Sequence, residues 1–348
     1  MATRDFTANV ISASKVEPSG PYQNSTASGV WDLSEQFDLR KGGNWPETGV
    51  SLQRALFGPR NSSPRTAVDQ VDISTLGNGT DFGGVTTHDN GGGVGFGSDT
   101  RCIFTGGAGN SNIIQFATFS TSGDFADFGD LTVGRINPAG FASNTRGCTA
   151  GGQAGAASDV IDYVTIASAG NATDFGNLDD GFENIGGGFA SSAGRGIIAG
   201  GYHSGSPKNK IQYVTISSTG NSTDFGDLTV ARQYVGGLAS ATRGVTFGGE
   251  ISNGSTSDVM DYITIGSTGN ATDFGDLTAA TKNTAGAASA TRGIRAGGTK
   301  ANGSGSVNTI DYITIGSTGN AQDFGDLSSS SNNDNIAGAA SSTPSSQP

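Results

Sequence analysis

The sequence predicts an all-β protein that folds as a six-bladed β-propeller. The tripeptide Asp-Phe-Gly occurs six times in the 348 residues, and its phenylalanines are 46 to 50 residues apart. Glycine contributes 58 residues, which recur in register with apolar runs and not in the triplets of collagen. A period near fifty residues with several short strands in each copy is typical of the blades of a propeller. The six repeated phenylalanines are Phe82, Phe128, Phe175, Phe225, Phe274 and Phe324.

Residues 231–277 show the four strands expected in one repeat. The first run, residues 234–240, is rich in glycine and alanine, and the second, 243–247, ends at a pair of glycines. The third run, 260–265, is rich in β-branched and aromatic residues, and the fourth, 272–277, contains the Asp-Phe-Gly tripeptide. Turn residues, such as the Gly-Asn pair before the fourth run, separate them. Four antiparallel strands repeated at this period predict one blade per repeat.

The composition of the first and fourth strands predicts where each lies in a blade. The innermost strands of a propeller converge on its axis, and small side chains fit there best. The fourth strand lies at the outer edge of the propeller, where a phenylalanine fills the space between blades. Burial of such a side chain contributes roughly 1.5–3 kcal/mol. We therefore interpret the six phenylalanines as structural, and the flanking aspartates as acceptors for backbone amides in turns. Because an active site is built once, six copies of a tripeptide that binds magnesium in protein kinases do not indicate phosphoryl transfer.

The two ends of the repeat region predict how the ring closes. The first repeat begins at residue 54 with second-strand material and has no glycine-alanine run before it. One extra run of that kind, residues 335–341, follows the last repeat. We therefore predict that this C-terminal strand completes the first blade and leaves no open edge in the ring. The predicted domains are an N-terminal docking segment at 1–50, the propeller at 51–342 and a tail at 343–348.

Charge and hydropathy exclude several classes of function. The formal net charge of −12 disfavours binding to nucleic acid or to anionic lipid, because both need basic surfaces. The chain has no run of eighteen apolar residues, so we expect no membrane insertion. The first ten residues lack the apolar centre of a signal peptide, so we expect synthesis in a cytoplasm.

The cysteines and histidines predict neither a disulfide nor a metal centre. Cys102 and Cys148 follow repeated arginines by one and two residues, which places them on opposite strand faces as buried free thiols. The two histidines, His88 and His203, are far apart in the sequence and match no zinc spacing. We therefore expect no metal, no cofactor and no catalytic residue, with calcium binding by aspartate-rich turns as an open alternative.

Residues 1–50 fall outside the repeat and contain both tryptophans of the chain. Asp32 followed by Glu35 forms a capping-box pattern and Gly42 is a helix terminator, so a small helix is predicted between them. A helix of about two turns is not stable alone, so its apolar side needs a surface to pack on. That surface is either the chain's own propeller or a partner protein, and the sequence leaves both open. In the second case the docking residues are Trp31, Leu33, Phe37 and Trp45.

Three segments of one repeat resemble the kelch family of repeats. They are RGIIAGGY (195–202), IQYVTIS (211–217) and TDFGDLTVAR (223–232), which give a hydrophobic strand, a double glycine, an aromatic-bearing strand and a final aromatic in the family's order. The family usually has tryptophan where this chain has the phenylalanine of the tripeptide. The resemblance extends over residues 54–341 and implies a propeller, but no particular activity, since such propellers both bind and catalyse.

Parts of the chain are also similar to virion structural proteins of tailed phages, especially marine phages and cyanophages. An opening such as SGVW…NWP (28–46) precedes variable domains in such proteins, and DYITIGSTGNATDFGDL (261–277) is similar to their repeats. The resemblance implies a non-enzymatic virion protein of the tail-fibre, knob or capsid-decoration type, made in the host cytoplasm and anchored by residues 1–50 to other virion proteins. It further implies that the propeller meets a host-surface glycan or envelope protein, with a homo-oligomer on the particle as a candidate assembly.

The loops between second and third strands differ from repeat to repeat and share a face with the connections from fourth to first strands. A repeated scaffold with varied loops is typical of a recognition protein. This face is therefore the predicted ligand surface. The candidate ligand contacts are Tyr202, His203, Lys208, Lys210, Arg232 and Gln233.

Two alternatives stay open: a free-standing lectin-like binding module and a propeller enzyme that acts on glycans. Copper chemistry of the galactose-oxidase kind needs tyrosines and histidines together, which His88 and His203 do not offer. Sialidase chemistry needs a cluster of arginines, but the arginines here repeat at one equivalent position and are interpreted as structural donors. Carboxylate pairs such as Asp127 and Asp130 also repeat and are interpreted in the same way. The repeated arginines are Arg101, Arg146, Arg195, Arg243 and Arg292.

Overall fold

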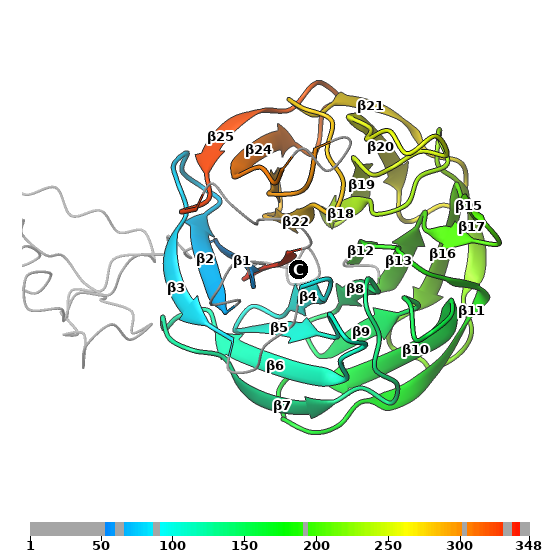
Figure 1. The fold of residues 1–348 in the computed structure, drawn as a ribbon, viewed down its shortest axis with the longest axis horizontal. Helices are drawn as coiled ribbons and strands as arrows, with labels where there is room; N and C mark the ends of the chain where they lie inside the picture. Colours follow the sequence, from blue (N-terminus) through cyan, green and yellow to red (C-terminus); the bar gives the residue numbers. More distant parts are fainter. Residues whose placement is uncertain are drawn as a thin grey trace, which may run out of the picture. The chain divides into compact units, whose positions relative to one another are not determined.

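The computed structural model describes residues 53–59, 66–85, 91–190, 194–300, 305–329 and 336–341. These residues form six four-stranded antiparallel sheets around a central axis, so the chain is an all-β, six-bladed propeller (Figure 1). In each blade the first strand lies next to the axis and the fourth at the outer edge of the propeller. The described residues contain no helix. The predicted helix and the docking residues Trp31, Leu33, Phe37 and Trp45 lie outside the described residues.

The strands of blades 1 to 3 follow one another from the axis outwards. Blade 1 consists of β26 (Ala337–Ala340), β1 (Arg54–Gly58), β2 (Ala67–Asp72) and β3 (Thr80–Gly84). Blade 2 consists of β4 (Val94–Gly97), β5 (Arg101–Thr105), β6 (Ile113–Thr118) and β7 (Ala126–Asp130). Blade 3 consists of β8 (Ala139–Ala142), β9 (Arg146–Ala150), β10 (Ser158–Thr165) and β11 (Thr173–Phe182).

Blades 4 to 6 have the same order, and blade 4 carries an additional hairpin. Blade 4 consists of β12 (Gly187–Ala190), β13 (Arg195–Ala199), β16 (Lys210–Thr215) and β17 (Thr223–Asp227), with the hairpin β14 (Tyr202–His203) and β15 (Ser206–Pro207) inserted. Blade 5 consists of β18 (Gly236–Ala239), β19 (Arg243–Phe247), β20 (Val259–Thr264) and β21 (Thr272–Asp276). Blade 6 consists of β22 (Ala285–Ala288), β23 (Arg292–Ala296), β24 (Thr309–Thr314) and β25 (Gln322–Asp326).

The C-terminal strand completes the first blade, which confirms the predicted closure of the ring. β26 pairs antiparallel with β1, so that Ala340 lies opposite Ala55 and Gly338 opposite Phe57. The amide of Ser341 extends this pairing by donating to the carbonyl of Arg54 at 2.8 Å. Because β1 also pairs with β2, it has a neighbour on each side and no exposed edge.

The inner strands pack so closely that their glycines have no space for a side chain. A Cβ atom on Gly286 of β22 would lie 2.2 Å from the carbonyl oxygen of Gly237 in β18. A Cβ atom on Gly188 of β12 would lie 2.4 Å from the carbonyl oxygen of Gly140 in β8. The strands nearest the axis therefore meet backbone to backbone, and this explains the glycine-alanine composition of the first run in each repeat.

Substitution of Gly286 by alanine is therefore expected to destabilise the propeller. The added methyl group forces two inner strands apart, and overpacking of this kind costs about 1–3 kcal/mol. The measurement is the free energy of unfolding in denaturant. Gly316 in the same blade is a matched control, because a Cβ atom there meets nothing within 4 Å. Equal stability of Gly286→Ala and Gly316→Ala would contradict the close packing.

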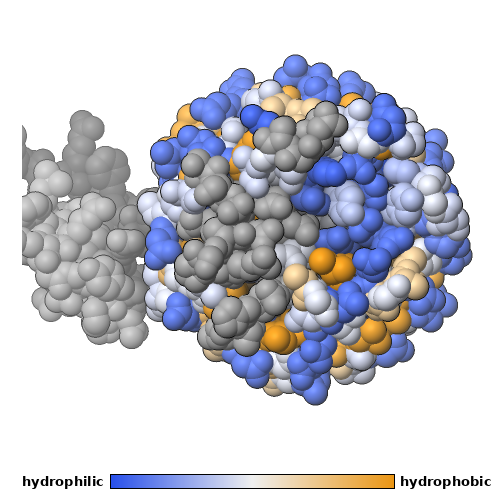
Figure 2. Space-filling model, in the orientation of Figure 1, coloured by the Kyte–Doolittle hydropathy of each residue, from blue (hydrophilic) through white to orange (hydrophobic). Residues whose placement is uncertain are grey.

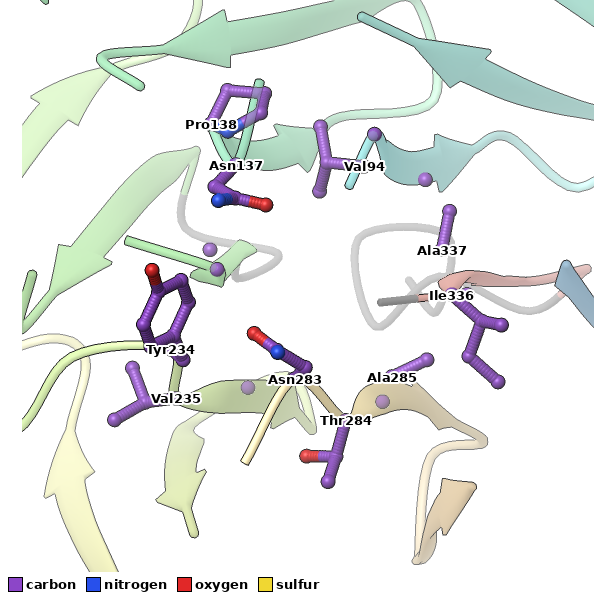
Figure 3. A pocket seen from close by; sticks show the side chains of 17 residues that line it. Val94, Asn137, Pro138, Tyr234, Val235, Asn283, Thr284, Ala285, Ile336 and Ala337 are labelled. Atoms are coloured by element: carbon purple, nitrogen blue, oxygen red, sulfur yellow. The ribbon is translucent and has the colours of Figure 1, made fainter. Parts of the chain in front are cut away.

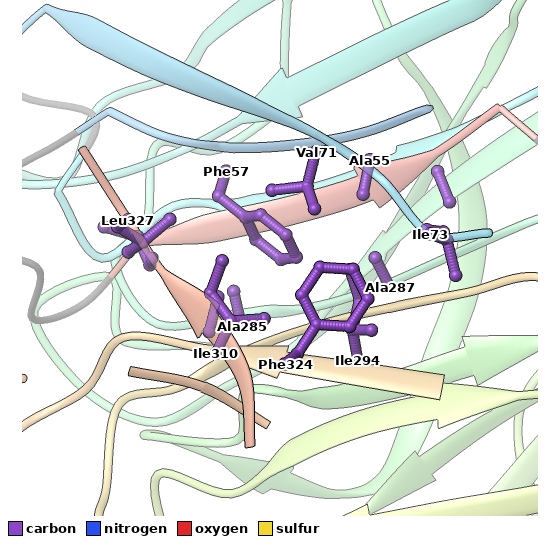
Figure 4. Packing of buried hydrophobic residues seen from close by; sticks show 13 residues of the cluster. Ala55, Phe57, Val71, Ile73, Ala285, Ala287, Ile294, Ile310, Phe324 and Leu327 are labelled. Atoms are coloured by element: carbon purple, nitrogen blue, oxygen red, sulfur yellow. The ribbon is translucent and has the colours of Figure 1, made fainter. Parts of the chain in front are cut away.

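The phenylalanines of the six tripeptides lie between blades. Each is buried, with 2–3% of its surface exposed. Phe324 of blade 6 packs in one cluster with Val71 and Ile73 of blade 1 (Figure 4). Phe225 of blade 4 packs in the same way with Ile263 of blade 5. Each ring thus joins the blade that carries it to the next blade, which is the position that its spacing in the sequence indicates.

The glycine of each tripeptide fixes the backbone of the boundary between two blades, which we call the seam. Gly226 lies at a β-bulge in the pairing of β16 with β17, and its φ is 147°. A Cβ atom on Gly226 would lie 2.4 Å from the carbonyl oxygen of Gly269 in blade 5. The amide of Gly269 donates to the carbonyl of Phe225 at 2.8 Å. Equivalent glycine contacts form the other seams at Gly83–Gly123, Gly129–Gly170, Gly176–Gly220, Gly275–Gly319 and Gly325–Gly77.

The acceptor role that the sequence suggests for the flanking aspartates belongs to other side chains. At the seam between blades 4 and 5, the amide of Asp227 donates to Oδ1 of Asn270 at 3.1 Å. Asparagines of the following blade accept at four further seams, and Asp124 accepts from the Gly84 amide at the remaining one. The expectation for the aspartates was wrong because the acceptor comes from the next repeat, which spacing within one repeat does not show.

The repeated arginines are structural donors. Arg195 of blade 4 donates through Nη1 to the carbonyl of Ile265 in blade 5 at 2.9 Å, and its guanidinium lies 4.6 Å from the centre of the Tyr213 ring. Arg54 is a sixth member of this set, which the sequence did not indicate, because it donates to the carbonyl of Phe119 in blade 2. The arginines at the other seams donate in the same way to carbonyls of Ile166, Ile216, Ile315 and Ile73.

Cys102 and Cys148 are free and buried, as predicted. Burial raises the pKa of the Cys102 thiol well above its ordinary value, so this thiol stays protonated.

The part of the chain that the structure describes contains no helix of the length and apolarity needed to cross a bilayer.

Candidate functional site

The connections that lead into the inner strands meet around the axis on one face of the propeller. Each connection runs from the outer strand of one blade to the inner strand of the next. Figure 2 shows a face of the molecule on which hydrophilic residues gather to the right of the axis, over the region of β13 and β19 in Figure 1. Two circles of residues, which we call together the axial rim, shape this part of the molecule.

Within the described residues, the inner circle of the axial rim consists of five equivalent residues that precede inner strands. Each has a left-handed backbone, with φ between 54° and 78°. The amide of Asn137 donates to the carbonyl of Gly92 at 2.6 Å, and the amide of Tyr234 donates to that of Asn184 at 2.7 Å. The amide of Asn283 in turn donates to the carbonyl of Tyr234 at 3.1 Å. The connections of neighbouring blades are therefore tied to one another around the axis.

Tyr234 is the exception in the inner circle. The other four positions hold glycine or asparagine, which adopt a left-handed backbone readily. A bulky side chain with φ of 55° is a conformational outlier. Such residues cluster at ligand sites and active sites, where the surrounding structure holds them. Tyr234 is thus the member of the circle whose identity the fold does not explain.

The outer circle consists of four isolated β-bridges between connections and loops. In blade 5, for example, the amides and carbonyls of Gln233 and Glu250 exchange hydrogen bonds of 2.8 and 3.0 Å. The backbone arrangement is the same in each case, but the side chains are not. The four bridges are Ile136–Gln153, Glu183–Tyr202, Gln233–Glu250 and Lys282–Thr299. A repeated backbone that presents unlike side chains is the arrangement expected of a recognition surface.

Side chains of the two circles form a continuous polar network. Asn137 donates through Nδ2 to Oδ1 of Asn184 at 3.1 Å, and Asn184 donates through Nδ2 to Oε1 of Gln233 at 3.1 Å. Gln233 donates to Oε1 of Glu250 at 2.9 Å, and the ammonium of Lys282 pairs with Oε2 of Glu250. The network runs from blade 3 to blade 6, so it orients side chains over more than half of the rim.

Lys282 and two glutamates set the electrostatics around Tyr234. Nζ of Lys282 lies 5.5 Å from the centre of the tyrosine ring. Burial raises the pKa of the Tyr234 hydroxyl, and the charges of Glu250 and Glu183 raise it further, with a contribution from Tyr202. The phenol therefore stays protonated at neutral pH and is available as a hydrogen-bond donor and acceptor.

The inner circle opens into an axial pocket with a volume of about 50 Å³ (Figure 3). This volume corresponds to about three or four water molecules. Asn137, Tyr234, Asn283 and Thr284 supply its polar side chains, and glycines of the inner strands line much of the remainder. Oδ1 of Asn137 and Oδ1 of Asn283 are buried and receive no hydrogen bond from the residues that the structure describes. In Figure 3 both amide groups point toward the space between the inner strands.

Two of the six predicted contact residues belong to the axial rim. Tyr202 lies on β14 and forms a backbone bridge with Glu183. Gln233 is 7% exposed and holds Glu250 and Asn184 in the polar network. Both were proposed from loop position alone, and the structure places them beside Tyr234.

Three other predicted contacts lie in blade 4 but outside the rim. Nδ1 of His203 lies 2.6 Å from the carbonyl oxygen of Gly181, so this nitrogen carries the proton. Lys208 donates through Nζ to the hydroxyl of Ser206 at 2.9 Å. Lys210 pairs with Asp179 at 2.5 Å and with the neighbouring Asp180 at 3.2 Å. Lys208 is thus engaged within its own blade, whereas His203 and Lys210 are engaged with β11 of blade 3.

The structure corrects the prediction for Arg232. Its side chain is completely buried, with the guanidinium paired to Asp261 at 2.5 Å and bonded to the carbonyls of Gly248 and Val259 at 2.7 and 2.6 Å. A guanidinium that is fully enclosed and paired with a buried carboxylate does not contact a ligand. The prediction was wrong because the side chain turns inward from the connection to meet a buried carboxylate on the third strand.

Most of the axial rim, including Tyr234, Glu250 and Lys282, was not predicted from the sequence. One signal pointed to it, because asparagine precedes the glycine-alanine run in several repeats, as in NPAGFA (137–142) and NTAGAA (283–288). Asparagine before a strand indicates a left-handed residue. A tyrosine at the same position, in YVGGLA (234–239), breaks this pattern.

The axial rim offers hydrogen-bond donors, acceptors and the aromatic side chains of Tyr202 and Tyr234, which are the components of a binding site. Within the described residues, no group of three or more histidine, cysteine, aspartate or glutamate side chains is placed to hold a metal ion. No model of a known protein family matches this chain, and no curated protein is similar to it.

Proposed function

We propose that the chain is a non-enzymatic recognition protein that presents a kelch-like propeller on the outside of a phage particle. The observation that carries this proposal is the outer circle of the axial rim. Four equivalent backbone bridges present Ile136 and Gln153, Glu183 and Tyr202, Gln233 and Glu250, and Lys282 and Thr299. The backbone bridge that supports these side chains is the same in each blade, whereas the side chains differ from blade to blade, as a binding surface requires.

The virion location draws its support from the sequence. The segment at 28–46 and the repeat at 261–277 are similar to parts of tailed-phage structural proteins, and the first fifty residues do not belong to the propeller repeat. In this proposal Trp31, Leu33, Phe37 and Trp45 dock the chain to another virion protein, as part of a tail fibre, knob or capsid decoration. Copies of the chain then present their axial rims to the host surface.

Deletion of residues 1–50 is expected to abolish incorporation into particles and to leave the propeller folded. The reason is that every strand the structure describes lies between residues 54 and 340. Purified particles are probed with antibody against the propeller, and the melting temperature of the truncated chain is compared with that of the full chain. Antibody labelling at the full level in the truncated form would contradict the docking role.

A free-standing lectin-like module is the second candidate, and the same polar network favours it. The two candidates predict different results for incorporation into particles and the same result, binding, for adsorption to bacterial envelopes. A full-length chain that is absent from particles but adsorbs to bacterial envelopes would support the free-standing module. A chain that adsorbs to no envelope and no glycan would contradict both.

A further inference from the structure

Tyr234 occupies a position that the fold builds more easily with asparagine. At the equivalent positions of blades 3, 4 and 6 the residue is Asn137, Asn184 or Asn283, and in blade 2 it is Gly92. The tyrosine ring lies in the wall of the axial pocket. A side chain that strains the backbone and lines a pocket is a candidate for contact with a ligand.

The pocket contains buried acceptors that no described residue satisfies. The side-chain amides of Asn137 and Asn184 each donate one hydrogen bond to the next side chain of the rim, which fixes their orientation. Oδ1 of Asn137 and Oδ1 of Asn283 remain as buried acceptors that no described residue satisfies. A buried acceptor without a partner is costly, so the occupant of the pocket is expected to bring donors.

The charge around the pocket excludes an anionic occupant. Glu183 and Glu250 both lie close enough to Tyr234 to raise the pKa of its hydroxyl. The nearby cation is Lys282, which is already paired with Glu250. A carboxylate, sulfate or phosphate entering here would meet carboxylates and acceptor oxygens, so the site favours a ligand without negative charge.

We infer that the axial pocket binds the edge of a neutral sugar, as the end of a host-surface glycan. Hydroxyl groups of the sugar donate to Oδ1 of Asn137 and Oδ1 of Asn283, and the apolar face of the sugar ring lies against Tyr234. The pocket volume of about 50 Å³ admits one or two hydroxyl-bearing groups and not a whole ring, so the ring stays at the mouth. This inference rests on the proposed recognition function and names the ligand class of that same site.

Replacement of Tyr234 by asparagine tests the aromatic contact. Tyr234→Asn copies the residue of three other blades, so the melting temperature is expected to stay the same or rise while binding falls roughly tenfold or more. The probes are an array of neutral glycans, with sulfated and sialylated glycans beside them, followed by calorimetry with the best neutral oligosaccharide. The full-length chain is used throughout.

Replacement of Asn283 by glycine tests the acceptor. Glycine keeps the left-handed backbone, as Gly92 does in blade 2, and removes the unpartnered oxygen. Binding of the neutral oligosaccharide is expected to weaken by roughly threefold to tenfold, the effect of one neutral hydrogen bond. Thr268→Ala, an exposed position in the loop between the third and fourth strands of blade 5, is the matched control and leaves binding unchanged.

Three results would overturn the inference. The first is a chain that binds only the sulfated or sialylated glycans. The second is neutral-glycan binding that both Tyr234→Asn and Asn283→Gly leave at the wild-type level. The third is adsorption to bacterial envelopes without any glycan binding, in which case the proposed recognition function stands and the sugar assignment fails. Failure of the recognition function itself is separate, since it requires that the chain adsorbs to no envelope at all.

Discussion

Deletion of residues 336–348 is expected to abolish cooperative unfolding of the propeller. The deletion removes β26, including the buried side chains of Ile336 and Ala339, and leaves β1 with an open inner edge. It also uncovers Phe57, which is 1% exposed in the closed ring. Burial of one Ile or Phe side chain contributes roughly 1.5–3 kcal/mol. Several such losses remove most of the roughly 5–15 kcal/mol by which a domain is stable.

The measurement is thermal unfolding followed by circular dichroism, together with gel filtration to detect association through the open edge. Deletion of residues 342–348 alone is the control, because it keeps β26 and its pairing with β1. The control is expected to melt with the full chain. A longer deletion with an unchanged melting curve would show that blade 1 is stable without its inner strand.

Replacement of Arg295 by threonine is expected to destabilise blade 6 by about 3–5 kcal/mol, because it leaves a buried carboxylate unpaired. The guanidinium of Arg295 pairs with Asp311 at 2.5 Å and donates to the carbonyl of Gly297 at 2.9 Å. Both side chains are nearly inaccessible, at 2% and 1% exposure. Burial lowers the pKa of Arg295, and the charge of Asp311 opposes that shift.

The neighbouring blade shows how to rescue this variant. In blade 5 the buried guanidinium comes from Arg232 on the connection, and Thr246 lies on the second strand opposite Asp261. In blade 6 the two residues are exchanged, with Thr281 on the connection and Arg295 on the second strand. Both guanidinium groups meet an equivalent carboxylate and equivalent carbonyls.

The double variant Arg295→Thr with Thr281→Arg is therefore expected to recover most of the lost stability. The free energies of unfolding of both single variants and of the double variant form a cycle, and the coupling energy is expected to favour the double variant strongly. Thr281→Arg alone adds a second buried cation and is expected to destabilise the chain. Additive effects in the cycle would contradict the exchange of positions.

The repeat made most of the fold predictable from the sequence. The spacing of six phenylalanines gave the number of blades, and the surplus glycine-alanine run gave the closure through β26. Both inferences depend on order along the chain. The seam partners, such as Asn270 for Asp227, were not predictable in this way, because their contacts cross from one repeat to the next.

The site was less predictable because side-chain direction decides it. Arg232 and Gln233 are adjacent in the sequence, yet Arg232 is buried against Asp261 while Gln233 belongs to the rim network. Loop position alone does not separate these two cases. Tyr234 was visible only as a departure from the asparagines at equivalent positions, and its meaning required the backbone angle.

The seams have a consequence for the gene that encodes this chain. Every junction uses the same parts, a phenylalanine and a glycine from one repeat against a glycine turn from the next. A blade copied from one place therefore fits its new neighbours at another. Recombination between the repeats would exchange residues of the outer circle and keep these junctions, which would give the proposed recognition function a route to new ligands.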